Sequence, residues 1–200
     1  ETQGVVAAPI EGINKISIEK NPDGTSYLSV YFAGPIRSAG GTAQGLTVLM
    51  TNYIQNKLGL EGYRPLEEEV ERYVHEVILY DRRCKPLQYC PTEDEIRTIV
   101  RKVPVCVDGD PTEDVEVMAH RDIKRIPTNN IRGGACLVIG EGLALKAKKL
   151  AKKAKDFGIN WDFLLSVGKK KAESEGAQDS ASFMSEIVGG RPIFSFSNTS

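Results

Sequence analysis

The chain has 200 residues, of which 40% are hydrophobic and 26% charged, and its formal net charge is −1. This composition is typical of a globular protein with one domain or two small ones, and it excludes a chain that is polycationic throughout. The sequence has no apolar run near the ~20 residues that a membrane helix needs and no basic-then-apolar leader, so we expect a cytoplasmic protein without a membrane partner. Because the chain begins at Glu1 and ends in a polar tail, we expect it to be a fragment of a longer protein.

The first 32 residues predict a β-hairpin behind an entry segment. Residues 1–12 are small and mixed, which is typical of a poorly ordered start. Two runs of β-branched and aromatic residues follow, at 13–18 and 27–32, and Asn21-Pro22-Asp23-Gly24 between them has strong turn chemistry. The two runs should therefore pair as antiparallel strands.

Three helices are predicted between residues 42 and 102. In 42–58 apolar residues recur at helical spacing, and Gly59 then supplies a stop. Glutamates fill the first turn of a second helix, 66–80, where they favour the positive end of the helix dipole. Thr92-Glu93-Asp94-Glu95 follows a proline and is a capping-box pattern, which opens a short helix to about residue 102.

The second half of the chain predicts further strands and helices. Two β-type runs, 103–107 and 115–118, flank Asp108-Gly109-Asp110-Pro111 and predict a second antiparallel pair. The expected elements after them are a helix at 143–157, a shorter helical region at 161–167, a polar loop or linker at 168–180, and a helix at 182–188 within the tail 181–200.

The order of these elements predicts the fold class. Strands and helices follow each other without a regular βαβ rhythm, which favours an α+β fold in which small antiparallel sheets or hairpins pack against several helices. We expect one N-terminal module at 13–167, with one or two subdomains. If there are two, the break falls near 120–130.

Charge is segregated along the chain. Residues 61–120 hold 8 Lys and Arg against 15 Asp and Glu, whereas 121–171 hold 13 against 4. Such asymmetry points to a charged partner. The basic part is concentrated in a helix without interleaved glutamates and in a lysine triplet that follows it; these residues are Lys146, Lys148, Lys149, Lys152, Lys153, Lys155, Lys169, Lys170 and Lys171.

These lysines predict a DNA-binding surface. Phosphates would relieve the repulsion between the like charges, and each neutralised phosphate would release counterions, so binding should weaken steeply with salt. Two alternatives stay open. The lysines can form a solvated face that serves solubility, or the acidic half of the same or a neighbouring chain can bind the basic half.

Two glycine-rich segments each carry one arginine, Arg37 and Arg132. The first arginine precedes Gly40-Gly41 and the second precedes Gly133-Gly134. An arginine offers a planar donor fork that suits phosphate, and neighbouring glycines allow the backbone to come close, so both arginines are candidate DNA-binding residues. The alternative is that both segments are turns in which φ requires glycine, and that the arginines pair with carboxylates of the acidic half.

No motif predicts catalysis. The acidic cluster at 108–116 departs from the EF-hand order and lies between two predicted strands, which favours a hairpin turn over a metal site. Gly140-Glu141-Gly142 resembles the backbone-clamping loop of KH domains, although it is one residue short and Glu141 has the wrong charge for phosphate. The four cysteines include no Cys-x-x-Cys pair and predict reduced thiols, with a Cys84–Cys90 disulfide as the alternative.

Four segments, in this order, resemble the N-terminal region of the large subunit of the archaeal D-family DNA polymerase. They are Tyr31–Thr42, the Glu-rich stretch 67–73, Pro127–Gly134 and Gly189-Gly190-Arg191-Pro192. Four segments in a shared order are far more specific than any single motif above.

The resemblance implies a non-catalytic module of a replicative DNA-directed DNA polymerase, a nucleotidyltransferase. In that family the large subunit polymerises with magnesium and the small subunit carries a 3′→5′ exonuclease, while the catalytic carboxylates and zinc-binding segments lie in other parts of the large subunit. No catalytic residue, metal ligand or cofactor is therefore expected in this chain. The expected partners are DNA, the small subunit and a second copy of the chain; the alternative is an assembly module without DNA contact.

Overall fold

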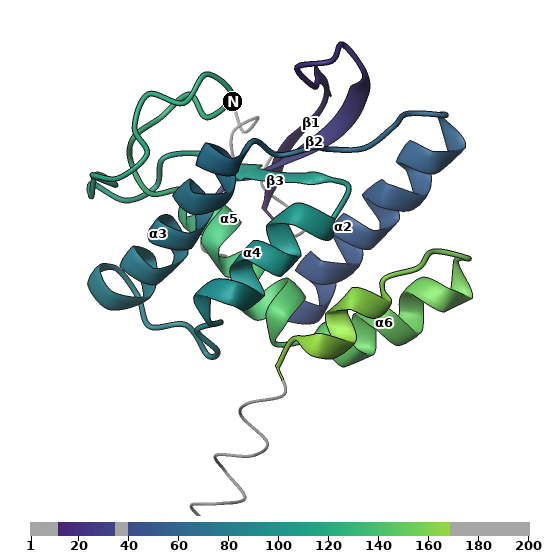
Figure 1. Cartoon of the computed structure of the whole chain (residues 1–200). Helices are drawn as coiled ribbons and strands as arrows, with labels where there is room; N and C mark the ends of the chain where they lie inside the picture. The colour runs from purple at the N-terminus through teal and green to yellow at the C-terminus, as the bar shows by residue number, and fades with distance from the viewer. Residues whose placement is uncertain (1–11, 35–39, 169–200) are drawn as a thin grey trace, which may run out of the picture. The chain divides into compact units, whose positions relative to one another are not determined.

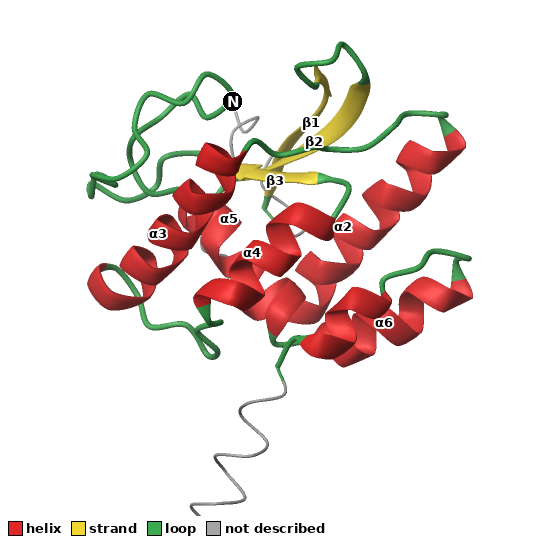
Figure 2. Cartoon of the chain, viewed as in Figure 1, coloured by secondary structure: helices red, strands yellow, loops and turns green. Residues whose placement is uncertain are grey.

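The computed structural model describes residues 12–34 and 40–168 (Figure 1). Within these residues it contains five α-helices, a 3-10 helix, a π-helix and one sheet of three strands, so the predicted α+β class is confirmed (Figure 2). The predicted entry segment, most of the linker at 168–180 and the helix at 182–188 lie outside the described residues.

The sheet begins with the predicted hairpin. Strands β1 (Ile13–Lys20) and β2 (Ser26–Phe32) pair antiparallel, with Ile18 opposite Leu28. The buried Asn21 closes the turn: its backbone N–H donates to the Thr25 carbonyl at 2.8 Å, and its side chain donates to the Gly62 carbonyl at 2.8 Å. The turn is thus fixed to a loop of the helical part, as well as by its own geometry.

The third strand corrects the second predicted hairpin. Strand β3 (Cys106–Gly109) pairs parallel to β2, in the order β1-β2-β3, so the sheet is mixed. Residues 115–118 form no strand, and their only sheet-like pairing among the described residues is a bridge between Glu116 and Asn130. The predicted antiparallel pair is therefore wrong. All four residues of β3 are buried, and the strand pairs with β2, which is distant in the sequence, instead of with the segment that follows the next turn.

The three predicted helices of the first half are confirmed. Helix α2 spans Gly40–Lys57 and ends before Gly59, which has φ +67°. Helix α3 spans Glu67–Arg83. Helix α4 spans Glu93–Lys102, and the Thr92 hydroxyl accepts from the Glu95 N–H while the Glu95 carboxylate accepts from the Thr92 N–H, as the capping box requires.

The second half forms a series of helical elements that follow each other along the chain. Helix α5 (Gly133–Leu137) continues into a π-helix (Val138–Ala144), and α6 (Ala147–Asp156) and a 3-10 helix (Asp162–Ser166) follow. The resemblance of Gly140-Glu141-Gly142 to a KH loop is therefore wrong, because these residues lie buried inside the π-helix.

Glycines allow the helices to cross closely. A Cβ on Gly45 of α2 would lie 2.7 Å from the Gly142 carbonyl oxygen and 2.6 Å from Leu150 Cδ1. A Cβ on Gly134 of α5 would lie 2.7 Å from the carbonyl oxygen of Phe32 at the end of β2. Gly41, in the segment of Arg37, is packed in the same way, because a Cβ there would run into the Glu141 carbonyl. Each Arg-bearing segment therefore has a glycine whose small size is required by close packing.

Helix α2 buries a polar face and exposes apolar residues. Gln55 is fully buried; its side chain accepts from the Leu28 N–H at 2.7 Å and donates to the Pro104 carbonyl at 2.9 Å. Met50, Ile54 and Leu58, one helical turn apart, are 39%, 46% and 59% exposed. The amide thus satisfies the backbone of the sheet, while an apolar stripe remains open to solvent.

The chain separates into two compact units at residues 167 and 168. The described core lies entirely in the first unit, from Val30 in β2 to Val167, and the stretch 120–130 belongs to this unit. No helix in the described ranges is both long and apolar enough to cross a membrane.

Candidate nucleic-acid interface

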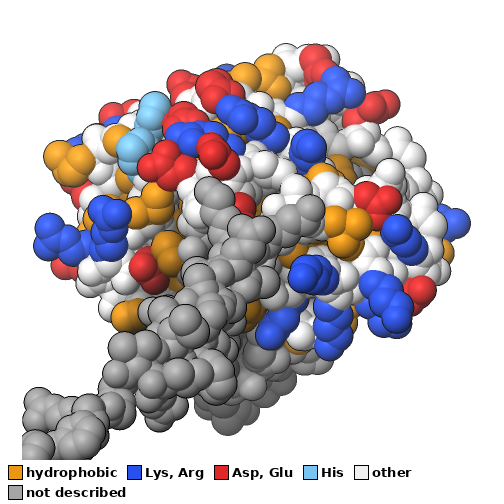
Figure 3. All heavy atoms as spheres, turned by 60° about the horizontal axis from the view of Figure 1, so that its bottom comes forward, with side chains coloured by type: hydrophobic (Ala, Val, Ile, Leu, Met, Phe, Trp, Pro, Cys, Tyr) orange, Lys and Arg blue, Asp and Glu red, His pale blue; other side chains and the backbone are white. Residues whose placement is uncertain are grey.

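Helix α6 carries the basic face that the sequence predicted. Its apolar residues recur at helical spacing and are buried, and they are Ala147, Leu150, Ala151 and Ala154. The lysines between them therefore lie on the solvent side of the helix. Lys148, Lys149, Lys152, Lys153 and Lys155 are exposed, and Lys146, just before the helix, is half-buried. In Figure 3 basic side chains gather on the lower right of the molecule, the side on which Figure 1 places α6.

The lysines of α6 differ in their partners. Lys153 pairs with Asp156 at 3.1 Å and Lys155 with Asp162 at 2.9 Å. Lys148, Lys149 and Lys152 have no ion pair with any described residue. These three, which we call the lysine face, lie within about one turn of each other and have positive charges that the described fold does not compensate.

The lysine face stands on a firmly packed base. The Tyr53 ring of α2 packs on Phe157, with the ring centroids 5.7 Å apart. The indole N–H of the buried Trp161 donates to the Asn52 side chain at 3.1 Å. These two contacts join α2 to the residues that follow α6, so packing against α2 orients α6.

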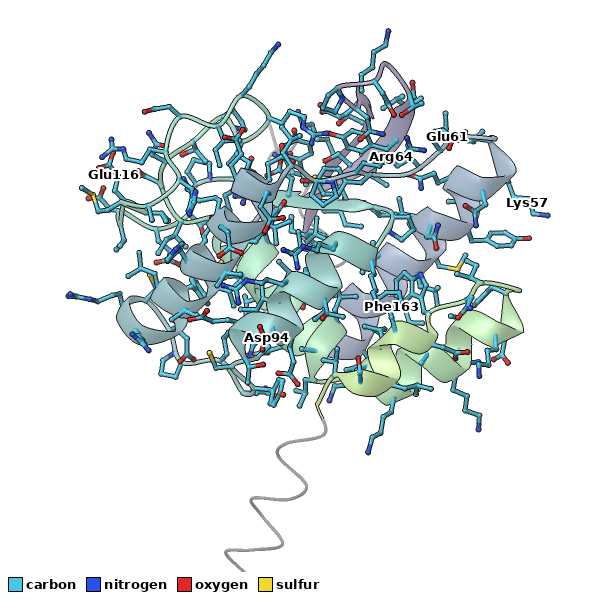
Figure 4. The ribbon with its side chains drawn as sticks, viewed as in Figure 1. Lys57, Glu61, Arg64, Asp94, Glu116 and Phe163 are labelled. Carbon is cyan, nitrogen blue, oxygen red and sulfur yellow. The ribbon has the colours of Figure 1, made fainter. Side chains whose placement is uncertain are left out.

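One cation near this base escaped the sequence analysis. The ammonium group of Lys57 lies 5.4 Å from the Tyr53 ring, at the end of α2, and Figure 4 shows it at the outer end of the helix. Tyr53 contacts Phe157 just after α6, so Lys57 lies on the helix that packs against this end of α6. Sequence alone gave no signal for it, because the two helices are about 100 residues apart.

Arg132 does not lie on this surface. It is fully buried, and its guanidinium donates to Glu76 at 2.7 Å and to Asp108 at 2.7 Å. The Cζ atom of the guanidinium lies 4.6 Å from the centre of the Tyr73 ring. The structure therefore corrects the assignment of Arg132 to DNA binding and places it in the alternative role, paired with carboxylates of the acidic half.

The carboxylates keep Arg132 charged. Burial works against a charged guanidinium, but Glu76, with help from Tyr73 and Asp108, holds the pKa of Arg132 well above its usual range. The backbone N–H of Arg132 also donates to Glu76, at 2.6 Å. The end of the motif, residues 131–134, is thus buried and leads into α5, so its arginine does not face a phosphate in solution.

Arg72 fixes the same motif from the other side. It is fully buried on α3, 3.4 Å from Glu76, and donates to the carbonyls of Thr128, Asn129 and Asn130. Arginine has five donors in a rigid fork, which suits several carbonyls of one bend. The sequence analysis did not single out Arg72, because an arginine between helix residues gives no sign that it is buried.

The remaining candidate residues are placed as follows. Arg37, Lys169, Lys170 and Lys171 lie outside the described residues. Asp108, in the acidic cluster at 108–116, belongs to β3 and is paired with Arg132, so this cluster is no hairpin turn. Within the described ranges no three or more His, Cys, Asp or Glu side chains lie together as possible metal ligands.

All four cysteines are free in the structure. Cys84 is half-buried at the end of α3, Cys90 is exposed, and Cys106 and Cys136 are buried. Burial raises the pKa of the Cys106 thiol to about 12. Local desolvation, together with the nearby Asp81 carboxylate, raises the pKa of the Cys90 thiol to about 11. The structure thus has thiols at 84 and 90, rather than the alternative disulfide.

Together these features define an α+β unit with a buried ionic cluster and one basic helix. Residues 1–170 match the family model described as DNA polymerase II large subunit DP2, N-terminal. The chain therefore belongs to this family.

Curated relatives agree with the family match. The chain is 50% identical to the DNA polymerase II large subunit of Methanosarcina barkeri, 48% to that of Methanothermobacter thermautotrophicus and 46% to that of Picrophilus torridus. The alignments cover 97–98% of the chain but 18% of each relative. The chain thus spans less than a fifth of the length of these relatives.

Proposed function

We propose that this chain is the N-terminal module of the large subunit of an archaeal family D polymerase, a replicative DNA-directed DNA polymerase in the cytoplasm. Its magnesium-dependent polymerase chemistry and the 3′→5′ exonuclease of the small subunit are then supplied by other parts of the enzyme. The family match and the relatives named as large subunits support this proposal.

Within that enzyme, the module binds DNA through the lysine face of α6. The observation that carries this proposal is the absence of a carboxylate partner for Lys148, Lys149 and Lys152 among the described residues, on a helix whose other face is fixed in the core. Three cations within about one helical turn repel each other, and DNA phosphates relieve that repulsion with a gain in counterion entropy.

The fold favours DNA over an acidic partner within the same unit. The acidic residues of α3 and α4 are largely committed to arginines: Glu71 lies 2.7 Å and Glu93 3.0 Å from Arg97, and Glu67 pairs with Arg101. Because these carboxylates already have cations, they are poor candidates to neutralise the lysine face. The alternative, in which the acidic residues of 61–120 bind the lysines of 121–171, is therefore less favoured.

A salt titration tests the proposal. A fluorescent primer-template is titrated with the chain at ~50 and ~200 mM salt; three phosphate contacts give a log–log slope of about −2.7, or about 40-fold weaker binding at the higher salt. The variant Lys148→Glu/Lys149→Glu/Lys152→Glu should lose this slope and bind weakly at both salts.

The matched control carries the same change of net charge at scattered sites. Lys20, Lys85 and Lys124 are exposed and lie off α6, so their replacement by Glu should leave most of the affinity and the salt slope in place. Equal losses in both triple variants would show that only net charge matters. No binding of the unmodified chain at ~50 mM salt would remove the DNA-binding role.

A second candidate function is subunit assembly, and one observation favours it. Ile16 and Ile18 on β1 are 51% and 63% exposed, in addition to the apolar stripe formed by Met50 and Ile54 on α2 and Leu58 just after it. Large apolar side chains open to solvent are typical of protein–protein contact surfaces. Light scattering of the chain and co-purification with the small subunit test this role, and Ile54→Lys should abolish either association; a monomer that does not co-purify with the small subunit contradicts it.

A further inference from the structure

A groove lies on the far end of α3, away from the lysine face. It has a volume of about 560 Å³ and runs between the last turns of α3 and the segment 115–119. Its apolar lining comes from Ile78, Leu79 and Val117, and Met118 stands at its side with 72% of its surface exposed. Figure 4 shows Glu116 on the loop that forms this wall.

The wall of the groove is held rigidly. The backbone of the segment pairs with the stretch before α5: Val117 N–H donates to the Asn129 carbonyl at 2.9 Å, and Ile131 N–H donates to the Val115 carbonyl at 3.0 Å. Arg72 adds a hydrogen bond to the His120 carbonyl, and the His120 ring stacks on His75 at 5.4 Å. The groove is therefore a formed feature with little to reorganise on binding.

Two arginines of the groove have no carboxylate partner among the described residues. Arg82 and Arg83 line it at the C-terminal end of α3, and neither makes an ion pair with a described residue. Every other arginine in the described ranges has at least one carboxylate partner; these are Arg64, Arg72, Arg97, Arg101, Arg121, Arg125 and Arg132. Glu116, the one acidic lining residue, is already paired with Arg121 at 3.1 Å.

We propose that this groove binds a short segment of a partner protein that carries carboxylates next to large apolar side chains. The carboxylates pair with Arg82 and Arg83, which present bidentate forks, and the apolar side chains fill the space along Ile78 and Leu79. A volume near 560 Å³ accommodates a few side chains, so the occupant is a peptide segment rather than a domain face.

Charge around the groove favours a peptide over a nucleic acid. The groove offers two guanidiniums that have no ion pair with a described residue, beside an apolar lining. A segment with one or two carboxylates and large apolar side chains matches both features, whereas a nucleic acid needs a row of cations for its phosphates and gains nothing from the apolar lining. This site differs from the lysine face in its element, its lining and its ligand, so its test does not depend on DNA binding.

The test begins with a selection from a phage-displayed library of random 12-residue peptides against the intact chain. Enriched peptides should share Asp or Glu next to Leu, Ile, Phe or Trp. Their dissociation constants are then measured by fluorescence anisotropy of labelled synthetic copies. The variants Arg82→Glu/Arg83→Glu and Met118→Glu should each weaken binding at least tenfold.

A control variant and a competitor make the result decisive. Lys20→Glu/Lys102→Glu makes the same change of net charge at exposed sites off the groove, and it should change the dissociation constant less than twofold. Circular dichroism checks that all variants remain folded. The proposal would be overturned if no peptide is enriched, or if the enriched peptides lack acidic residues. It would also be overturned if the Arg82→Glu/Arg83→Glu variant binds the peptides as well as the unmodified chain does, or if single-stranded DNA binds through these arginines and displaces the peptide.

Discussion

At the scale of single residues, the core of this protein is organised by buried charge. Arg72 and Arg132 lie against Glu76 and Asp108, and all four are at most 2% exposed. Isolated buried charges cost several kcal/mol each, so such a cluster persists only when every member is paired. Its role here is positional, because the two arginines fix the chain from residue 120 to the start of α5.

Glu76→Ala should destabilise the chain strongly. The substitution leaves two buried guanidiniums with one carboxylate, and breaking a buried ion pair from one side costs about 3–5 kcal/mol. Urea unfolding followed by circular dichroism measures the change in the free energy of unfolding. Glu71→Ala is the matched control: it breaks the partly exposed pair with Arg97, for which about 0–1 kcal/mol is expected. Equal losses in the two variants would contradict the role given to the cluster.

At the scale of elements, the fold depends on the close crossing of α2 and the π-helix. Glycines at 41, 45 and 142 bring backbone against backbone, since a Cβ at 41 or 45 would run into the carbonyls of Glu141 or Gly142. Helix α6 packs on the same helix α2 through Leu150, next to Gly45. The position of the lysine face therefore depends on two glycines that lie one turn apart on another helix.

Gly45→Ala should destabilise the chain although it replaces glycine inside a helix. In an exposed helix this change stabilises by about 1 kcal/mol, but here the added methyl group overlaps Leu150 and a carbonyl oxygen, for which overpacking costs about 1–3 kcal/mol. Thermal and urea unfolding show whether the substitution raises or lowers the free energy of unfolding. Lys57→Ala, at the exposed end of the same helix, should stay within about 0.5 kcal/mol. A more stable Gly45→Ala variant would show that the helices separate easily.

At the scale of the whole molecule, the near-neutral chain divides into surfaces of different character. Most carboxylates of α3 and α4 pair with arginines. In the part of the chain that the structure describes, the lysine face of α6 has no carboxylate partner, and the groove near Arg82 combines two arginines without an ion pair with an apolar lining. The net charge alone does not predict these separate surfaces, because it adds up positive and negative groups that neutralise each other in local ion pairs. The two proposed sites lie on different helices of one compact unit.

A chain truncated after Gly168 should keep its fold and melting temperature. The described core ends at Val167, and the compact first unit ends there too. For a chain of this size about 1 kcal/mol corresponds to roughly 2–4 °C, so we expect a change below about 2 °C in calorimetry. A drop of 10 °C or more would mean that residues 169–200 contribute to the stability of the first unit, and the predicted boundary at 167 and 168 would be wrong.

The sequence by itself determined the elements whose signals are local. The hairpin followed from Asn21-Pro22-Asp23-Gly24 between two β-type runs, and α4 from the capping box at Thr92. The orientation of α6 followed from the spacing of its alanines and Leu150. In each case the residues that decide the structure lie within one or two turns of each other, so period and capping suffice to predict the result.

Only the tertiary structure decided what depends on distant partners. Strand β3 pairs with β2 across about 75 residues, Gln55 turns inward to meet two backbone groups, and Arg132 is buried because Glu76 and Asp108 converge on it. The sequence allowed Arg132 to be either a phosphate ligand or a buried ion-pair partner. The choice rests on which groups surround the side chain after packing, and a one-dimensional pattern of residue types does not contain that information.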